Sequence, residues 1–402
     1  MPLLVICNPV CGDGTAKALF EAHVLPLLEK HGKGVYKLVE TTVDAHAGIA
    51  LAQFLESTAT SKDQVNVILG SGDGTLHDIV NYLPSIQLTG DRAGKPFPRI
   101  HFSLVPCGTA NALYSSLFPP PSSDVDIAYR LQSVTSFLES KPAIPLSVAI
   151  TNLSSPPFAR KRPQTAVSSV VTSTALHASI LHDSEALRKE IPSMERFKVA
   201  ARNNSTKWYT SSVKLLPAPS IGVVEIYDPT TKTFIPHAES VLDDPIVDVE
   251  GPFAYFLSTV NVDRLEPQFR ITPLSRTIPP SEATCDIIIL RPLRDPSNDW
   301  DESPEAREAF VAKLWLVLGG AYSNGAHIDL RYNEEGEIVT EGDGPTVVEY
   351  VRCGGWEWSP DDMDPSAHFL CSDGAIFHIE QGGRAVCSAA TPQEGAGFAV
   401  YA

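Results

Sequence analysis

The sequence predicts an α/β first domain with a doubly wound parallel sheet, followed by a mainly antiparallel β-sandwich domain. Two observations lead to this fold class. In residues 1–145, apolar runs of strand length alternate with segments of helical periodicity, as in a parallel sheet with helices on both faces. In residues 146–402, longer strand candidates follow one another with turns between them, which favours antiparallel pairing. Each part is long enough to build its own core.

The elements of the first domain follow from their hydrophobic periodicity. Leu3–Cys7 is a continuous apolar run, typical of a strand that is buried on both faces. From Phe20 onward, apolar residues recur at i, i+4, i+7 and i+8, which indicates a helix. The remaining expected elements are strands at 36–39, 65–69 and 101–105, a helix at 45–55, and a helix at 76–83 that Pro84 stops.

The second domain reads as a run of strands with one inserted helix. Pro- and Ser-rich segments at 119–123 and 141–145 mark the exit from the first domain, and 154–164 reads as a surface loop. Ser303 followed by Pro304 is a helix start, and that helix is expected to run to about residue 318. The main strand candidates are residues 223–228, 253–262, 285–293, 327–332 and 347–353.

Composition limits the cell compartments and the classes of binding partner that fit this protein. The chain has 31 Lys and Arg against 48 Asp and Glu, a net charge of −17, which argues against nucleic-acid binding. The seven cysteines are scattered without metal-type spacing, so we interpret them as reduced thiols of an intracellular protein. We expect no signal peptide, because a strand begins at once, and no stretch approaches the roughly 18 apolar residues of a membrane span.

Three strand-to-helix turns of the first domain are rich in small residues. They read NPVCGDGTA at 8–16, GSGDGT at 70–75 and PCGTANAL at 106–113. In a doubly wound sheet such turns face one crevice, where glycines let backbone N–H groups approach a phosphate. One such turn alone is often only a tight turn, but three in order predict a polyphosphate site. None is a Walker A loop, because no GK[ST] follows at the required spacing.

These turns resemble the signature turns of the diacylglycerol kinase catalytic family, which includes sphingosine and ceramide kinases. The serine in GSGDGT and the form PCGTANAL resemble the sphingosine and ceramide kinase branch. Later segments are also similar to that branch, namely DSEALR at 183–188, EYVRCGGWEWSP at 349–360 and CSDGAIFHI at 371–379. The resemblance implies a fold similar to NAD kinases and lipid kinases, with ATP and Mg²⁺ as cofactors.

The resemblance also assigns roles to residues. Phosphoryl transfer needs positioning, charge neutralisation and a group that accepts the hydroxyl proton. Asp73 is expected to be that base or a carboxylate that organises the metal, while Ser71 and Asp183 would contact the lipid. Asp373 would help to hold Mg²⁺. The residues expected to bind the nucleotide are Asn8, Pro9, Gly12, Gly14, Thr41, Gly72, Gly74, Thr75, Gly108, Thr109, Asn111, Arg188, Arg196 and Asp373.

Plainer interpretations stand beside these roles. Asn8 and Asn111 also fit loop or N-cap asparagines, and Glu185 with Arg188 fits a surface ion pair at i, i+3. His177 and His182 read as ordinary pocket or surface residues. Five aromatic residues are candidates to line an acyl pocket, but core packing is the better explanation for most of them. They are Trp208, Tyr209, Phe253, Tyr255 and Phe256.

The chain departs from the family pattern in two places. The first turn has Asp13 where the family usually has a basic residue, and an acid beside a triphosphate is unfavourable unless it faces solvent or a metal. Lys17 follows one helical turn later and is a candidate for the missing charge. After Asp373-Gly374, Ala375 replaces the glutamate of the family. Both features favour, as an alternative, a catalytically impaired protein that binds nucleotide or lipid.

We therefore expect an ATP-dependent lipid kinase that phosphorylates the primary hydroxyl of a sphingoid base in a cleft between domains 1–145 and 146–402. Ceramide and diacylglycerol are alternative substrates, and NAD kinase, which uses a similar GGDGT turn, is an alternative enzyme. The last strands of the second domain are candidates to pack back toward the cleft. A cytoplasmic location with peripheral contact to intracellular membranes fits this substrate class, and a homodimer is left open.

Overall fold

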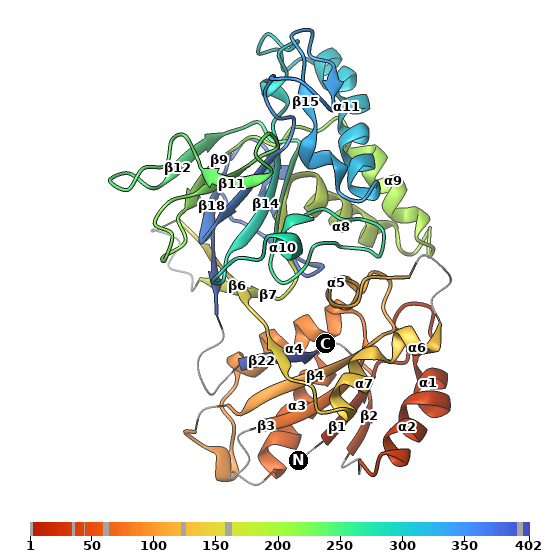
Figure 1. Cartoon of the computed structure of the whole chain (residues 1–402). Coiled ribbons are helices and arrows are strands. Elements are labelled where there is room, and N and C mark those ends of the chain that lie inside the picture. Colours follow the sequence, from red (N-terminus) through yellow and green to blue (C-terminus); the bar gives the residue numbers. More distant parts are fainter. Residues whose placement is uncertain are drawn as a thin grey trace. The chain divides into compact units, whose positions relative to one another are not determined.

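A computed structural model of the chain divides into two compact units (Figure 1). The first comprises residues 1–148, 264–267 and 391–402, and the second comprises residues 149–263 and 268–390. The structure describes residues 3–33, 37–43, 45–58, 64–95, 97–121, 126–156, 163–391 and 397–402. The first unit is an α/β domain and the second is rich in antiparallel strands, so the predicted fold class is confirmed.

The sheet of the first unit has the strand order β2-β1-β3-β4-β22-β5 among the described residues. Every neighbouring pair in it is parallel except β22 with β5. The chain reverses its direction across the sheet between β1 and β3, which creates the switch point where ligands bind in such folds. The strands are β1 (Leu3–Cys7), β2 (Lys37–Glu40), β3 (Gln64–Ser71), β4 (Arg99–Pro106), β5 (Ala143–Pro145) and β22 (Gly397–Tyr401).

Strand β22 comes from the end of the chain and pairs with β4 in the first unit (Figure 1). The sequence boundaries place it in the second domain, but its contacts are with the first. Phe398 stacks on Phe102 with ring centroids 6.0 Å apart, and the Tyr401 hydroxyl donates to Asn66 Oδ1 at 3.0 Å. Only long-range pairing reveals this, because the local pattern of β22 is that of any short strand.

Helices cover both faces of the sheet in the first unit. Leu3, Val5 and Cys7 pack in one buried cluster with residues of α1, α2 and α7. Leu4 and Ile6 alternate with them and are fully buried too, so the opposite face is also covered. The helices are α1 (Ala16–Leu19), a π-helical segment (Phe20–Val24), α2 (Leu25–Lys30), α3 (His46–Ser57), α4 (Asp73–Ser85), α5 (Ala112–Leu117), α6 (Ile127–Arg130) and α7 (Gln132–Leu138), with a 3₁₀ turn at Gly90–Arg92.

The second unit contains two larger antiparallel sheets among its described residues. One has the order β11-β10-β17-β14-β13-β8-β19-β20 and the other β12-β9-β18-β21-β6-β7; β15 and β16 pair separately. The strands are β6 (Val148–Ser154), β7 (Gln164–Ser168), β8 (Val171–Thr174), β9 (Ser211–Leu216), β10 (Glu225–Asp228), β11 (Thr233–Pro236), β12 (Val247–Glu250), β13 (Tyr255–Thr259), β14 (Cys285–Leu290), β15 (Arg331–Tyr332), β16 (Ile338–Val339), β17 (Glu349–Cys353), β18 (Gly355–Pro360), β19 (Phe369–Ser372), β20 (Ala375–His378) and β21 (Arg384–Ala390).

Aromatic side chains join the two larger sheets. Phe256 on β13 contacts Trp356 and Trp358 on β18, with ring centroids 5.1 and 5.3 Å apart, which makes the arrangement a sandwich. Phe253 adds an edge-to-face contact with Phe256 at 6.1 Å. The five aromatic residues considered for an acyl pocket, Trp208, Tyr209, Phe253, Tyr255 and Phe256, are all buried. Core packing therefore accounts for them.

The second unit contains two helices besides the single inserted helix that the sequence predicts. Helices α8 (Ala175–Leu187) and α9 (Glu195–Asn204) pack on each other. Only the end of α8 was anticipated, from the i, i+3 spacing of Glu185 and Arg188. Thr174 stands at the N-cap of α8 but makes no capping hydrogen bond with its side chain. The strand predicted at 327–332 is mostly a 3₁₀ turn, with only Arg331–Tyr332 in a strand. The remaining helical pieces are α10 (Leu274–Thr277), α11 (Pro304–Tyr322) and 3₁₀ turns at Pro292–Arg294, Ala326–Asp329 and Pro365–His368.

Helix α11 begins where the sequence predicts, and its cap can be tested. The Ser303 hydroxyl accepts a hydrogen bond from the Ala306 N–H at 3.2 Å. Ser303→Ala removes that acceptor, so we expect the free energy of unfolding to fall by about 1 kcal/mol. Denaturant unfolding measures the change. Ser303→Gly is the matched control and should cost only a few tenths of a kcal/mol, because glycine is tolerated at this position.

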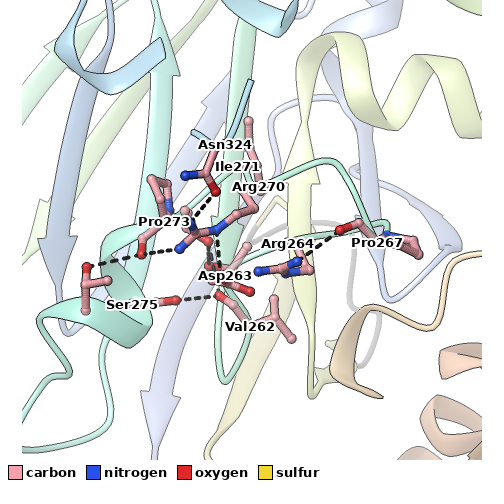
Figure 2. A network of polar contacts seen from close by, with 12 residues as sticks. Val262, Asp263, Arg264, Pro267, Arg270, Ile271, Pro273, Ser275 and Asn324 are labelled. Atoms are coloured by element: carbon pink, nitrogen blue, oxygen red, sulfur yellow. Dashed lines mark hydrogen bonds and ion pairs between the residues drawn. The ribbon is translucent and has the colours of Figure 1, made fainter. Parts of the chain in front are cut away.

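A long connection between β13 and α10 is held by a partly buried ion pair (Figure 2). Arg270 Nε donates to Asp263 Oδ2 at 2.9 Å, and its Nη1 donates to Asn324 Oδ1 at 2.7 Å. The Ser275 hydroxyl donates to the carbonyl of Val262 at 2.9 Å, which closes the loop. These contacts fix the parts of the connection that belong to the second unit, on either side of residues 264–267.

None of the helices in the described part of the chain is both long enough and apolar enough to cross a bilayer. Part of the predicted surface loop 154–164, namely 157–162, lies outside the described residues, as do Tyr36 of the predicted strand 36–39 and residues 122–123 of the Pro-rich segment.

Candidate functional site

The three glycine turns lie side by side because their strands do. β1, β3 and β4 are neighbours in the sheet, and each turn follows the carboxyl end of one of them. The Asn8 amide Nδ2 donates to the Thr75 hydroxyl at 3.2 Å and so joins the first turn to the second across the switch point. The Cys107 N–H donates to the carbonyl of Ser71 at 3.1 Å and joins the second turn to the third.

The glycines allow the backbones of the turns to touch. A Cβ atom added to Gly72 would lie 2.9 Å from Gly108 Cα, and one added to Gly108 would lie 2.9 Å from Gly72 N. A Cβ atom on Gly12 would overlap the Cys107 carbonyl oxygen. Gly12 also has φ +56° and Gly14 has φ +75°, in the left-handed region that favours glycine. Turn-to-turn packing therefore explains Gly12, Gly72 and Gly108.

The Asp73 carboxylate connects the second turn to the helix after the third. Its Oδ2 accepts a hydrogen bond from the Ala112 N–H at 2.7 Å, and its Oδ1 accepts one from the Leu113 N–H at 3.1 Å. These are N–H groups of the first turn of α5, which lack partners within the helix. Asp73 thus caps α5 from a distance of 39 positions in the sequence. A carboxylate oxygen accepts more than one hydrogen bond, so capping is compatible with contact to a substrate.

Asn111 shapes the third turn rather than capping α5 itself. Its Oδ1 accepts from the Gly108 N–H at 2.9 Å, and its Nδ2 donates to the Gly108 carbonyl at 2.7 Å. It has φ +52°, a conformation that asparagine tolerates better than most residues. Asn111 therefore occupies the N-cap position of α5, as the plainer interpretation expects, but its side chain does not cap the helix. The capping oxygens come from Asp73.

The charges of the first turn are already engaged. The N–H and hydroxyl of Thr15 donate to the exposed Asp13 carboxylate at 3.0 and 2.6 Å. These bonds, with a smaller contribution from the charge of Arg130, hold the pKa of Asp13 below its ordinary value. Lys17, the candidate for the missing basic charge, forms an ion pair with Glu40 at 2.9 Å.

A cation that sequence reasoning missed lies beside the third turn. Arg130 Nη2 donates to the carbonyl of Pro106 at 3.0 Å and lies 3.6 Å from the Cys107 sulfur. Hydrogen bonding with Cys11 and the nearby Arg130 charge lower the pKa of the Cys107 thiol. Arg130 lies 24 positions after Pro106 in no recognisable motif, so only the fold brings it here.

The other predicted residues of the first unit surround the turns. Thr41 follows β2, and its N–H donates to the carbonyl of Cys7 at 2.9 Å. The buried Ser71 hydroxyl donates to the carbonyl of Gly72 at 3.0 Å. Gly74 and Thr109 are exposed, and Pro9 is half-buried. Helix α4 begins at Asp73 with Gly72 as its cap residue, so Thr75 accepts from Asn8 instead of capping the helix.

Asp183 belongs to helix α8 of the second unit, and its side chain contacts helix α9. Its Oδ2 accepts from Asn204 Nδ2 at 2.7 Å, and its Oδ1 lies 2.8 Å from His182 Nδ1. Burial alone raises the pKa of this carboxyl, but the hydrogen bonds from Asn204 and His182 and the charge of Lys207 bring it below its ordinary value. The His182 ring stacks on Phe369 with centroids 4.1 Å apart. The side chain is therefore a charged group in a partly apolar setting, and Asn204 is a partner that the sequence did not indicate.

Two arginines that are predicted to bind the nucleotide belong to the second unit. Arg188 pairs with Glu185 at 3.1 Å, and both side chains are largely exposed, which confirms the expected i, i+3 pair. Arg196 Nη1 donates to the carbonyls of Pro192 and Ser193 at 2.9 and 3.1 Å. Nucleotide binding by either arginine stays a prediction.

Asp373 is buried and surrounded by backbone donors. Its carboxylate accepts from the N–H groups of Ser169, Val170 and Val171 at 2.7–2.9 Å. The residue itself has φ +47°. These bonds hold the turn between β7 and β8 against the β19–β20 hairpin, so a structural role accounts for the side chain. A contact with Mg²⁺ or nucleotide stays a prediction.

The described residues contain no group of three or more His, Cys, Asp or Glu side chains arranged to hold a metal ion. Mg²⁺ in phosphoryl-transfer sites is usually bound by one or two carboxylates together with substrate phosphates and water. Asp73 is the carboxylate at the glycine turns that fits this requirement.

Comparison with known proteins agrees with this geometry. Residues 2–136 match the diacylglycerol kinase catalytic domain. The match covers about a third of the chain and includes all three glycine turns and Arg130. The match thus agrees with the resemblance to the diacylglycerol kinase catalytic family as a whole. It does not distinguish the sphingosine and ceramide kinase branch from other members.

Curated relatives match the same part of the chain. Mitochondrial acylglycerol kinase of Mus musculus is 28% identical over 144 residues, which is 36% of this chain and 30% of that protein. The Homo sapiens protein of the same name is 27% identical over 144 residues, with the same shares. The chain thus matches less than a third of the length of these relatives.

Two solved structures are similar over nearly their whole length. A proposed diacylglycerol kinase from Bacillus anthracis str. Sterne has a TM-score of 0.54 and 14% identity, covering 100% of this chain and 97% of that one. A second structure of a diacylglycerol kinase from the same organism gives 0.50 and 15%, with the same coverage. At this identity the similarity concerns the fold, which both units of this chain share with those proteins.

Proposed function

We propose that this protein is an ATP-dependent lipid kinase, which transfers the γ-phosphoryl group of ATP to the hydroxyl of a lipid alcohol. The observation that carries the proposal is the convergence of three glycine turns at the β1–β3 switch point, where their backbones touch at Gly72 and Gly108. Such a cradle suits the phosphates of a nucleotide. The matched catalytic domain supports the same activity.

Within this activity, Asp73 is the residue placed to act on the reacting groups. Its carboxylate is held by two backbone N–H groups at the centre of the turns, so its orientation is defined before substrate binds. We assign it the role of accepting the proton of the lipid hydroxyl or of organising Mg²⁺, which would neutralise phosphate charge when bound. Asn8, Thr75 and Asn111 hold the surrounding turns in register.

For the lipid we propose a sphingoid base, with an acylglycerol as the second candidate. A sphingoid base carries a cationic amine, and the Asp183 carboxylate, half-buried beside the His182–Phe369 stack, is suited to a cation with an apolar chain. The acylglycerol candidate rests on the named activity of the curated relatives. Peripheral contact with an intracellular membrane follows from either substrate.

The first experiment is phosphate transfer from labelled ATP by the full chain to a panel of sphingosine, ceramide, diacylglycerol, monoacylglycerol and NAD. Transfer to one of the lipids supports the proposal and identifies the substrate. Transfer to NAD alone would replace it by an NAD kinase. ATP binding without any transfer would indicate a catalytically impaired protein, the alternative that Asp13 and Ala375 favour.

The role of Asp183 has its own test. Asp183→Asn keeps an acceptor for Asn204 but removes the negative charge, so a sphingoid base would lose a charge-assisted hydrogen bond. We expect its kcat/KM to fall about 10- to 150-fold, with the KM of ATP unchanged. Ceramide, which is neutral, is the matched comparison and should change little. An altered KM for ATP with an unchanged KM for the lipid would move Asp183 to the nucleotide.

A further inference from the structure

We propose that Arg130 is a nucleotide-binding residue that supplies the positive charge which the first glycine turn lacks. This inference rests on the proposed function and adds a residue to its phosphate site. The ligand chemistry that Arg130 would recognise is the phosphate chain of a nucleoside di- or triphosphate. Arginine suits this task because its planar guanidinium offers five N–H donors and stays charged at any physiological pH.

The position of Arg130 follows from its contacts with the third turn. Nη2 is anchored on the carbonyl of Pro106, the last residue of β4, and lies next to the Cys107 sulfur. Cys107 is followed directly by Gly108, whose backbone touches Gly72. The guanidinium therefore lies one residue from the point where the second and third glycine turns meet. The first turn is also close, because Gly12 packs against the backbone of Cys107.

The helix that carries Arg130 is held firmly. The Asp126 carboxylate accepts from the Tyr129 N–H at 2.7 Å and caps α6. The buried Tyr129 ring packs edge-to-face on Tyr114 with centroids 5.4 Å apart, and its hydroxyl donates to the Phe118 carbonyl at 2.9 Å. Because the neighbouring residue is fixed in the core, Arg130 reaches the turn from a defined position.

The guanidinium retains donors for a ligand. Both polar contacts of the guanidinium use Nη2, and no acceptor among the described residues receives a hydrogen bond from its Nε or Nη1. The side chain is half-buried, which limits competition from water. The other cation near the first turn, Lys17, is paired with Glu40. Asp13 interacts with the Arg130 charge at longer range, but its carboxylate accepts its hydrogen bonds from Thr15.

The test compares Arg130→Gln with wild type for ATP, ADP and adenosine, by isothermal titration of the full chain. Loss of a charge-assisted contact to phosphate should raise the Kd of ATP about 10- to 150-fold, while the Kd of adenosine stays within about twofold. Arg130→Lys keeps the positive charge but lacks the planar set of N–H donors of the guanidinium, so it should retain part of the affinity. A merely structural role would weaken ATP and adenosine alike, and lysine would not rescue it.

Arg99→Gln is the matched control, because it changes the net charge equally. Arg99 is exposed at the opposite end of β4, roughly 23 Å from Pro106 at the rise of a β-strand, so ATP affinity should not change. Wild type that binds neither ATP nor ADP would overturn the proposed function itself. Wild type that binds ATP, with unchanged affinity in Arg130→Gln, would overturn only the role of Arg130.

Discussion

Asp73→Asn is expected to lower the rate of phosphate transfer by 10² or more, which is the loss typical of removing a general base. The measurement is turnover at saturating ATP and lipid. The structure adds a second consequence. Asparagine has one side-chain oxygen, which accepts from one of the two α5 N–H groups, and its NH₂ group then faces the second N–H, which loses its acceptor. The free energy of unfolding should therefore also fall by about 1–3 kcal/mol.

A control separates chemistry from capping. Asp364 in the second unit is a similar capping aspartate, since its Oδ1 accepts from the Ser366 and Ala367 N–H groups at 3.1 and 3.3 Å. Asp364→Asn should therefore lose stability without the large loss in turnover. Near-normal turnover of a folded Asp73→Asn protein would show that Asp73 is a cap alone.

Gly108→Val is expected to weaken ATP binding about 10- to 150-fold, because each backbone hydrogen bond to a charged phosphate that is lost costs roughly 1.5–3 kcal/mol. The reason is steric and does not lie in the backbone angles of this residue. The Gly72 backbone occupies the space that the Cβ needs, and a forced separation would move the second and third turns apart. Overpacking of this kind also costs about 1–3 kcal/mol of stability.

Isothermal titration with ATP measures the effect, and thermal unfolding checks that the variant is folded. Gly319→Val on α11 is the matched control, because a Cβ there meets no atom within 4 Å. ATP affinity should be unchanged in that variant. A folded Gly108→Val protein with wild-type ATP affinity would mean that the nucleotide does not bind at the meeting point of the turns.

The fold class could be predicted from local patterns because burial leaves a periodic trace in sequence. Leu3–Cys7 was expected as a strand with those bounds, and the start of α11 followed from Ser303 and Pro304. Most of helix α8 escaped prediction because Thr174, which stands at its N-cap, is also the last residue of strand β8 and ends a run of residues that favour strands. β22 escaped assignment to the first unit because strand pairing over nearly 300 positions leaves no local signal.

The candidate site shows the same division. Sequence by itself determined which residue types stand in the three turns, because glycine, asparagine and aspartate at strand ends have a restricted set of uses. It could not show that Asp73 caps α5, that Gly72 meets Gly108, or that Arg130 lies beside Cys107. These contacts depend on the order β1-β3-β4 in the sheet. Strand order is set by the packing of the whole core, and only the tertiary structure decides it.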